Sequence, residues 1–263
     1  MHRKLIILLS LLYIFFASWT SAFKVGGWLP LYQICILFAF ALVLIDRHFK
    51  IYFQKEDMFL MASMIVLFIS SIFHAHDKTM NYMMAYFYVF VLLYLVFKST
   101  LIHYRFDLKK ILNINSIAVI IVCFFSSTEF FLEFLFNIEI SEYILRTREA
   151  TATYMPGVPR SYGFSTEPTA LAMYINTLGP IALWNINQWN ISRVTKYFII
   201  LTIALGWFFT FSAAGFLFFT LSFIISLVIY RKVHILFTKK TIIFWLGFLA
   251  ILLINFEICL LYS

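Results

Sequence analysis

The sequence predicts an all-α integral membrane protein, and three observations lead to this fold class. Of the 263 residues, 63% are hydrophobic and only 12% are charged, whereas a soluble domain is about half apolar and about a quarter charged. Long apolar runs recur along the chain, and the Lys and Arg residues between them alternate in abundance. Because the runs are continuously apolar and do not alternate residue by residue, helices are favoured over other membrane-spanning structures.

Nine apolar runs have roughly the 20 residues that a helix needs to cross a hydrocarbon core of about 30 Å. They are 5–23, 28–45, 58–73, 80–97, 110–127, 168–187, 197–211, 214–230 and 241–262. The first run follows a basic segment, as in a signal peptide, but Thr20-Ser21-Ala22 is a weak cleavage site and eight more runs follow. We therefore expect an uncleaved first span and a single polytopic membrane domain over residues 1–263.

Two sequence features are expected to interrupt the helices. Residues 197–230 form a stretch of 34 residues without a charge, which as one helix would be about 51 Å long. That is too long for one crossing, so the chain is expected to fold back at Ser212-Ala213-Ala214-Gly215. Within the sixth run, Gly179-Pro180 predicts a kink, because proline removes a backbone donor. The kink would serve packing alone or open a cavity beneath the neighbouring polar stretch.

The distribution of Lys and Arg predicts the orientation, because cytoplasmic connections carry an excess of both. If the chain starts inside, 15 of the 20 lie in cytoplasmic connections: Arg3, Lys4, Arg47, Lys50, Lys55, Lys98, Arg105, Lys109, Lys110, Arg193, Lys196, Arg231, Lys232, Lys239 and Lys240. The other five are Lys24, Lys78, Arg146, Arg148 and Arg160. We therefore expect a multi-pass protein with a cytoplasmic amino terminus and with residues 128–167 outside.

The external segment 128–167 is the longest connection that this topology predicts. It opens with Thr128–Glu139, an apolar stretch with a glutamate every few residues, which is expected to form a helix in the outer interface. The segment ends in the polar stretch Arg160-Ser-Tyr-Gly163-Phe-Ser-Thr-Glu167-Pro168. Loops this long in compact proteins are commonly functional or disordered, and the interface-seeking aromatic residues favour order.

The residue types of this segment suggest chemistry on a phosphate-bearing substrate. Arginine presents a planar, permanently charged fork that matches phosphate oxygens, so Arg146, Arg148 and Arg160 are expected to hold a diphosphate. Glu167 can accept a proton from an attacking hydroxyl, and Gly163 lets a ligand approach the backbone closely.

Structural explanations exist for the same residues. Arg160 can anchor the chain at the interface, and Glu167-Pro168 is an ordinary helix start, with an acid at the positive end of the helix dipole. Arg146 and Arg148 have glutamates as sequence neighbours and can form a salt-bridged loop.

Several other classes of site are not expected. His74 and His76 offer too few ligands for a metal centre, and Cys35, Cys123 and Cys259 lie inside apolar runs without disulfide or ligand spacing. The scattered basic residues form no continuous face, so nucleic acid is not expected as a partner.

The polar stretch resembles a motif of the O-antigen polymerase and O-antigen ligase superfamily, which includes the Wzy-like polysaccharide polymerases. The resemblance rests on Arg160-x-x-Gly163-x-x-x-Glu167-Pro168, followed by an apolar helix with Ala170 and Ala172. Arg146-x10-Gly157 is similar to the arginine–glycine pattern of the family's external loops. Phe209-Thr-Phe-Ser212 resembles its Thr-x-Ser turn, after which the family often carries an arginine and this chain carries Ala213.

The resemblance implies a membrane glycosyltransferase. It would join oligosaccharide repeat units carried on undecaprenyl diphosphate into a surface polysaccharide, O-antigen or capsule, without a metal or nucleotide cofactor. The resemblance also implies a multi-pass protein of the bacterial cytoplasmic (inner) membrane, active at the outer face. Arg160 would contact the diphosphate and Glu167 would hold the loop or sugar hydroxyls as the catalytic pair. The substrate-binding set would be Arg146, Arg148, Tyr162, Gly163 and Ser212. Partners would be the lipid-linked oligosaccharide, the bilayer and other polysaccharide-assembly membrane proteins.

Members of that family usually have more spans and a second large external loop. The ninth run reaches the outside at Ser263, so a truncated member with low or no activity of its own is expected. A transporter or flippase for lipid-linked oligosaccharide is the main alternative, but transporters place ionisable residues within spans and show paired repeats. A third alternative is a non-catalytic assembly partner.

Overall fold

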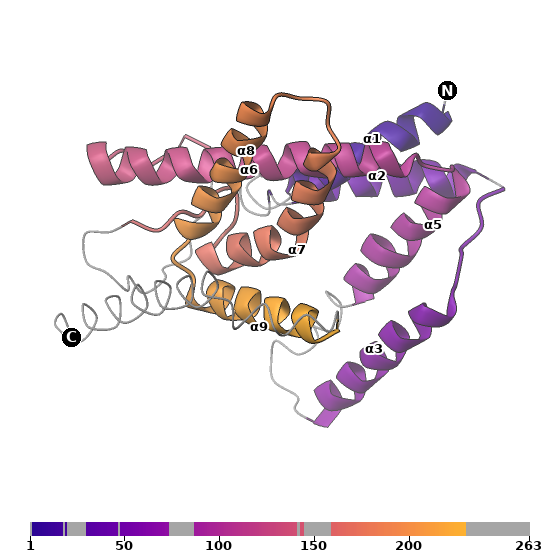
Figure 1. Ribbon diagram of the computed structural model, residues 1–263. Helices are drawn as coiled ribbons and strands as arrows, with labels where there is room; N and C mark the ends of the chain where they lie inside the picture. The colour runs from indigo at the N-terminus through magenta and orange to yellow at the C-terminus, as the bar shows by residue number, and fades with distance from the viewer. Residues whose placement is uncertain are drawn as a thin grey trace. The chain divides into compact units, whose positions relative to one another are not determined.

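The computed structural model describes residues 2–17, 19, 30–46, 48–73, 87–140, 143–144 and 159–229, and the regular structure of this part is entirely helical (Figure 1). The elements are α1 (His2–Phe16), α2 (Leu31–Ile45), α3 (Lys55–Phe73), the π-helical η1 (Val89–Val96), α5 (Phe97–His103), α6 (Leu108–Phe136), α7 (Pro168–Asn187), α8 (Arg193–Phe208) and α9 (Ala213–Ile229). The predicted all-α class is confirmed for these residues. The predicted ninth run, 241–262, lies outside them.

The chain divides into two compact units. Unit 1 comprises Met1–Ala17 and Leu31–Ile114, and unit 2 comprises Ser18–Pro30 and Asn115–Ser263. Helix α6 belongs to both, since its first turns fall in unit 1 and the remainder in unit 2.

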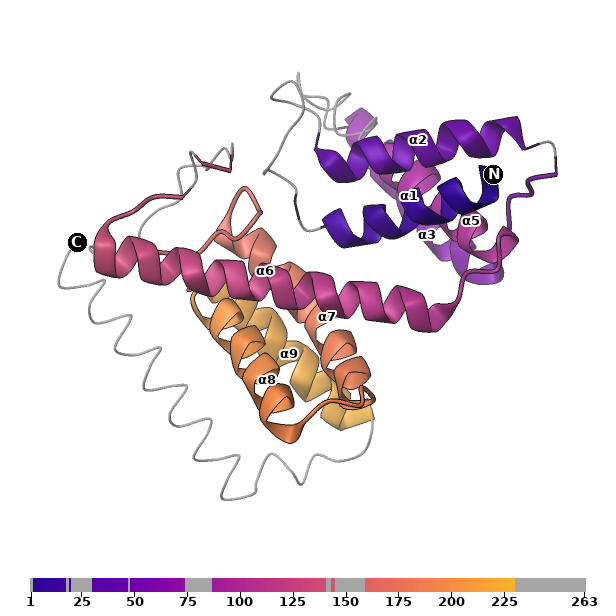
Figure 2. The same ribbon diagram turned by 90° about the horizontal axis from the view of Figure 1, so that it is seen from above.

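In unit 1, α1 and α2 lie side by side in opposite directions (Figure 2). The start of α1 therefore meets the end of α2, and the core there consists of Ile6, Val43 and Tyr104, which are at most 6% exposed. The guanidinium of Arg3 adds a polar contact, because its Nη2 donates to the Tyr104 carbonyl at 3.1 Å. The turn after α5 is thus fixed against the α1–α2 pair.

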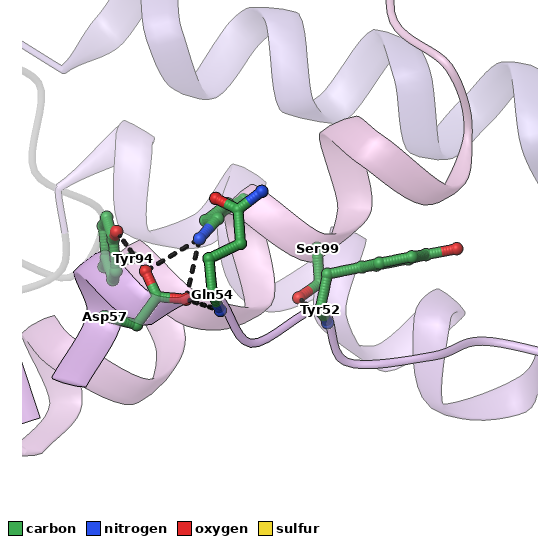
Figure 3. A network of polar contacts seen from close by, with 6 residues as sticks. Tyr52, Gln54, Asp57, Tyr94 and Ser99 are labelled. Atoms are coloured by element: carbon green, nitrogen blue, oxygen red, sulfur yellow. Dashed lines mark hydrogen bonds and ion pairs between the residues drawn. The ribbon is translucent and has the colours of Figure 1, made fainter.

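Helix α3 is joined to the η1–α5 segment by the buried carboxylate of Asp57, as Figure 3 shows. Both its oxygens accept from Lys98 Nζ at 2.7 Å, Oδ1 accepts from the Tyr94 hydroxyl at 2.6 Å, and Oδ2 accepts the N–H of Gln54 at 2.7 Å. The Lys98 ammonium, the Tyr94 hydroxyl and the Gln54 amide together lower the pKa of Asp57 to about 2. Asp57 thus links three segments of the chain.

This contact also explains a difference from the predicted boundaries. The fourth run was expected to end at residue 97, but the helical backbone continues to His103 and includes Lys98. A lysine extends the helix rather than ending it because Asp57 compensates its charge. Likewise α3 begins at Lys55, three residues before the predicted start, with Glu56 and Asp57 in its first turn, where the helix dipole favours acids.

The core of unit 2 is built from α6, α7 and α8. Residues from each contribute to one cluster, among them Val122, Leu171 and Ile203. The packing of α8 on α6 is close at one point, where a Cβ built on Gly206 would lie 2.7 Å from the Cα of Cys123. Helix α9 packs on α7, and a side chain at Gly215 would meet Ala172 in the same way. Only glycine permits these two contacts.

Helix α6 corrects one prediction. The fifth run was expected to end at residue 127 and to be followed by a separate interfacial helix over Thr128–Glu139, but one helix runs to Phe136. Its buried positions continue past 127 at helical spacing, through Ser126 to Glu129 and Phe130. The helix ends at Asn137, which adopts a left-handed conformation with φ 52° and donates its N–H to the backbone carbonyl of Glu133.

The predicted boundaries of α7 agree closely, but those of α8 do not. Helix α8 begins at Arg193 rather than at 197, because the Ser192 side chain caps it, and the predicted turn residues Ala213, Ala214 and Gly215 already belong to α9. Helix α7 covers the predicted 168–187, and the break between α8 and α9 falls at residues 209–212. Helix α7 contains Pro180, and its axis changes direction along its length in Figure 1. Among the described residues, α6 is the one helix that is both long and apolar enough to cross a membrane, whereas Leu31–Ile45 and Ala213–Ser222 are shorter apolar helices.

Candidate functional site

The polar stretch that leads into α7 is largely buried, although it has no regular secondary structure. Five consecutive residues of this stretch are buried: Arg160, Ser161, Tyr162, Gly163 and Phe164. Buried irregular backbone must find hydrogen-bond partners outside its own segment. The residues that supply those partners define the candidate site.

Glu129 of α6 is the central partner. Its side chain is fully buried, and its Oε2 accepts the N–H of Tyr162 at 3.0 Å and the N–H of Gly163 at 2.8 Å. The Ser161 hydroxyl lies 3.1 Å from the same oxygen and 2.8 Å from the Ser126 carbonyl, and its one hydrogen is shared between these two acceptors. Hydrogen bonds to a charged group contribute about 1.5–3 kcal/mol each, so this carboxylate fixes the shape of the turn.

A pair of serines supports the same turn. The hydroxyls of Ser126 and Ser161 are 2.6 Å apart, and Ser161 also contacts the Ser126 carbonyl at 2.8 Å. Ser126 Oγ in turn donates to the Gly206 carbonyl of α8 at 3.0 Å. Because Ser126 and Glu129 are three residues apart on one helix, they present both contacts on the same face.

Gly163 has a local reason to be glycine. Its φ of 56° lies in the left-handed region, and an added Cβ would lie 3.1 Å from Leu171 Cδ2. The conformation turns its N–H and that of Tyr162 toward one carboxylate oxygen. The residue predicted to let a ligand approach thus shapes the turn around Glu129.

Aromatic stacking holds the turn on its other side. The ring centroid of Phe164 lies 4.4 Å from that of Trp19 and 4.3 Å from that of Phe125, with interplanar angles of 28° and 18°. Offset stacking of this kind adds about 0.5–1.5 kcal/mol per pair beyond burial. The turn is therefore held by a carboxylate on one side and by two rings on the other.

Arg160 contacts the connection between α8 and α9. Its Nε donates to the Thr210 carbonyl at 3.2 Å, and the neighbouring Ser161 N–H donates to the Phe209 carbonyl at 2.9 Å. Phe209 is itself stacked on Phe130 of α6 at 4.0 Å. Because a guanidinium is planar, a hydrogen bond at Nε fixes the orientation of the whole group.

Glu167 occupies the N-cap position of α7, with Pro168 at the first helical position. Its backbone is extended and its carbonyl accepts the N–H of Leu171 at 3.3 Å, but its side chain makes no capping hydrogen bond. Among the described residues, this half-buried carboxylate has no hydrogen-bond or ion-pair partner. The helix start thus uses the backbone of Glu167 and leaves the carboxylate available.

Ser212 connects the two helix starts at the site. Its Oγ accepts the N–H of Gly215 at 3.1 Å, which caps α9, and it lies 3.4 Å from Thr169 Oγ1 in the first turn of α7. The side chain is 1% exposed. Its observed contacts are those of a helix cap.

The structure brings most, but not all, of the predicted site residues together. Arg160, Tyr162, Gly163, Glu167 and Ser212 surround the start of α7, whereas Arg146 and Arg148 lie outside the described residues. His74 and His76 also lie outside them. No group of acidic, histidine or cysteine side chains in the described part is arranged to hold a metal ion.

Sequence reasoning missed Glu129. It was assigned to a surface helix, although it lies three residues after Ser126 and extends the polar side of a buried stripe. That spacing is the signal that would have placed Glu129 inside.

Comparison of the chain with models of protein families, with curated proteins and with solved structures gives no match.

Proposed function

We propose that this chain is a multi-pass membrane glycosyltransferase that polymerises undecaprenyl-diphosphate-linked oligosaccharide repeat units at the outer face of the cytoplasmic membrane. The observation that carries the proposal is the contact between two short segments that were singled out separately. Arg160 belongs to the polar stretch and Thr210 to the Thr-x-Ser turn, and they are joined by a hydrogen bond across 50 residues.

The exposed surface supports placement in a bilayer. Large apolar side chains point outward along several helices, for example Phe59 at 79%, Leu44 at 69% and Val194 at 78% exposed. An isolated exposed apolar residue needs no explanation, but α3 carries them along most of its length. Together with the length of α6, this surface suits hydrocarbon better than water.

Contacts within unit 1 support the proposed orientation. Arg3 contacts Tyr104, Tyr104 donates to Asp46, and the N–H of Tyr52 donates to Ser99. The positive-inside count assigns the connections that carry these residues to the cytoplasmic face. Connections on the same face of a membrane can contact one another, and the hydrogen bonds above join connections that are all assigned to the cytoplasmic face.

Contacts within unit 2 support it in the same way. Glu129, the stretch from Arg160 to Gly163, and Thr210 are all assigned to the outer face, and they are linked by hydrogen bonds. An outer position also suits a substrate displayed on the outer leaflet.

In the proposed reaction, the bond between the anomeric carbon of the growing chain and the diphosphate oxygen breaks. A hydroxyl oxygen of the next repeat unit forms the new bond to that carbon, and its proton passes to Glu167. The departing undecaprenyl diphosphate keeps the electron pair, and the Arg160 guanidinium stabilises its charge. The hydrogen bonds that Glu129 accepts from the turn between Arg160 and Glu167 position both residues.

The test is complementation of cells that lack the gene, read as a gel ladder of surface polysaccharide. Long polymers restored by the unmodified chain would support the proposal and would contradict the expectation of a truncated member with little activity. Arg160→Ala and Glu167→Gln should then lower polymerisation by about 100-fold or more. Arg160→Lys keeps the charge without the fork and should be intermediate. Arg193→Ala, an exposed arginine at the start of α8, is the matched control and should leave the ladder unchanged.

Glu167→Gln is the most informative variant, since its carboxylate makes no contact that folding requires among the described residues. If the unmodified chain and all its variants give only single units on the surface, despite normal expression, polymerisation by this chain is contradicted. Units that accumulate on the inner leaflet when the gene is missing would contradict it in favour of a flippase.

A further inference from the structure

A cavity lies at the end of unit 1 where α1 begins and α2 ends. It has a volume of about 370 Å³ and is lined by Arg3, Ile6, Leu42, Ile45, Asp46, His48 and Tyr104. This volume is within the usual range of about 300–1,000 Å³ for small-molecule sites. The lining combines one guanidinium, one carboxylate, one imidazole and one phenol with an aliphatic wall.

The two opposite charges are held apart by one tyrosine. Arg3 Nη2 donates to the backbone carbonyl of Tyr104 at 3.1 Å, and the hydroxyl of the same residue donates to Asp46 Oδ2 at 2.6 Å. Tyr104 is 6% exposed and packs against Ile6 and Val43, so it is a fixed spacer. Arg3 and Asp46 form no ion pair with each other.

Each charge keeps capacity for a ligand. Arg3 is exposed and has one hydrogen bond from its five guanidinium N–H groups to a described residue. The side chain of Asp46 is 27% exposed, and beyond Tyr104 it accepts the His48 N–H at 3.0 Å, with His103 Nε2 at 3.7 Å. A carboxylate has about four acceptor positions, so it can accept further donors.

The apolar wall continues onto the outer surface of α2. Ile45 lines the cavity and is 69% exposed, and its neighbour Leu44 is exposed to the same degree. A ligand bound to the charges would therefore have an exposed apolar surface beside it. That arrangement suits an amphiphile better than a small water-soluble ion.

We propose that this cavity binds the headgroup of a zwitterionic aminophospholipid, with Arg3 on the phosphate, Asp46 on the primary ammonium, and the acyl chains along Ile45. In the proposed orientation the lipid belongs to the inner leaflet. The inference uses the membrane placement but not polymerisation, because binding is measured without oligosaccharide.

The experiment is native mass spectrometry of the purified full chain with three added lipids that share their acyl chains. Phosphatidylethanolamine carries a primary ammonium, phosphatidylcholine carries a quaternary one that cannot donate, and phosphatidylglycerol carries none. The unmodified chain should retain phosphatidylethanolamine about tenfold or more over the other two, as one charge-assisted hydrogen bond predicts.

Two variants separate the two contacts. Asp46→Asn should bring the phosphatidylethanolamine-to-phosphatidylcholine ratio close to one while both lipids still bind. Arg3→Gln should weaken all three lipids together and preserve their order. Glu56→Gln and Lys109→Gln change exposed charges of the same unit that do not line the cavity, and they should match the unmodified chain.

Folding and ligand source have their own readouts. Asn at position 46 keeps an acceptor for Tyr104, so far-ultraviolet circular dichroism and the elution volume should not change. Equal retention of the three lipids by the unmodified chain, or an unchanged preference in a folded Asp46→Asn variant, would overturn the proposal. Soluble phosphoethanolamine should compete weakly; full displacement at equal concentration would assign the site to a free phosphate ester instead.

Discussion

Asp57 in unit 1 and Glu129 in unit 2 are both fully buried carboxylates, and the two units satisfy them in different ways. Asp57 pairs with a cation, Lys98, and also accepts the Tyr94 hydroxyl and the Gln54 N–H, so that it connects α3 and the residue before it to the η1–α5 segment. Glu129 accepts two backbone N–H groups and a hydroxyl from one short turn. The first carboxylate fixes how helices pack, and the second fixes the shape of a segment that carries candidate catalytic residues.

The difference has a consequence for tolerance to change. A buried ion pair can be replaced by apolar residues of similar volume at little cost in stability, provided both partners change. Backbone N–H groups cannot be removed by substitution, so nothing can replace the acceptor at Glu129 except another acceptor. We expect stability to depend on both sites, and activity per folded molecule to depend on Glu129 alone.

The largest effect is expected for Glu129→Ala. It leaves the N–H groups of Tyr162 and Gly163 buried without their acceptor, which should cost about 2–5 kcal/mol of unfolding free energy and abolish polymer formation. Glu129→Gln retains one carbonyl oxygen and should recover part of the stability. Thermal unfolding and the polysaccharide ladder measure the two effects; a normal ladder with Glu129→Ala would mean that the turn does not need this carboxylate.

The second largest effect is expected at the Asp57–Lys98 pair. Asp57→Asn and Lys98→Met should each lower the unfolding temperature, and the double variant should lose less than the sum, because each single change leaves a buried group unpaired. The ladder, normalised to folded protein, should stay intact. Lys109→Met, which removes an exposed charge in the same unit, is the control; additive losses would show that the pair is not coupled.

The same pair predicts acid sensitivity. The pKa of Asp57 is lowered from 3.8 to about 2, chiefly by Lys98, so the folded state favours the ionised carboxylate. The contribution of Asp57 to the unfolding free energy is therefore complete above its unfolded pKa. That contribution should fall as the pH drops from about 4 to about 2. Unfolding temperatures of the unmodified chain and Asp57→Asn should therefore converge in this range, and a constant difference would contradict the assignment.

Gly163→Ala tests the backbone conformation of the turn that Glu129 holds. A left-handed alanine costs about 1–2 kcal/mol, and its Cβ would crowd Leu171. Gly163→Asn, which tolerates this backbone region better, should recover part of the loss. Gly179→Ala in α7 meets only ordinary contacts, at 3.4 Å or more, and should be near neutral; equal losses at both positions would contradict the role of φ at Gly163.

The smallest effect is expected for Ser212→Ala. It removes the hydroxyl that accepts the Gly215 N–H, and the loss of such a cap costs about 1 kcal/mol. Ser212→Asp keeps an acceptor and should restore stability. If polymerisation falls much further than stability in Ser212→Ala, the hydroxyl contacts substrate as well as capping α9.

The fold was predictable where the determining signals are local. Pro168 marks the start of α7. The length of the uncharged stretch predicted a break, although the break lies at 209–212 and not at the predicted Ser212–Gly215. Glu129 was misjudged because it was assigned to a separate interfacial helix, and Lys98 because it was treated as the end of an apolar run. Their partners lie 32–34 and 41 residues away, and for Glu129 those partners are mostly backbone groups, which no sequence pattern identifies.

Within the candidate site, the sequence predicts which residue types can act, and the structure adds the contacts that they make. Arg160 and Glu167 were selected by their chemistry, and they flank the turn that Glu129 holds. Gly163 and Ser212 were expected to face a ligand, but their observed contacts are a left-handed turn and a helix cap. The chemical type of a side chain can be inferred from sequence, whereas its partner depends on segments far apart in the chain.

The close packing of Gly206 on Cys123 has a consequence for thiol chemistry. The Cys123 side chain is fully buried beneath α8, and Cys35 is 8% exposed, so neither sulfhydryl presents itself to a water-soluble maleimide while the chain is folded. With Cys259 replaced by serine, one additional cysteine, introduced at Lys109 or at Asn190, would test the proposed membrane topology. The native thiols would become reactive only on unfolding, which gives the same labelling experiment an internal measure of folded protein.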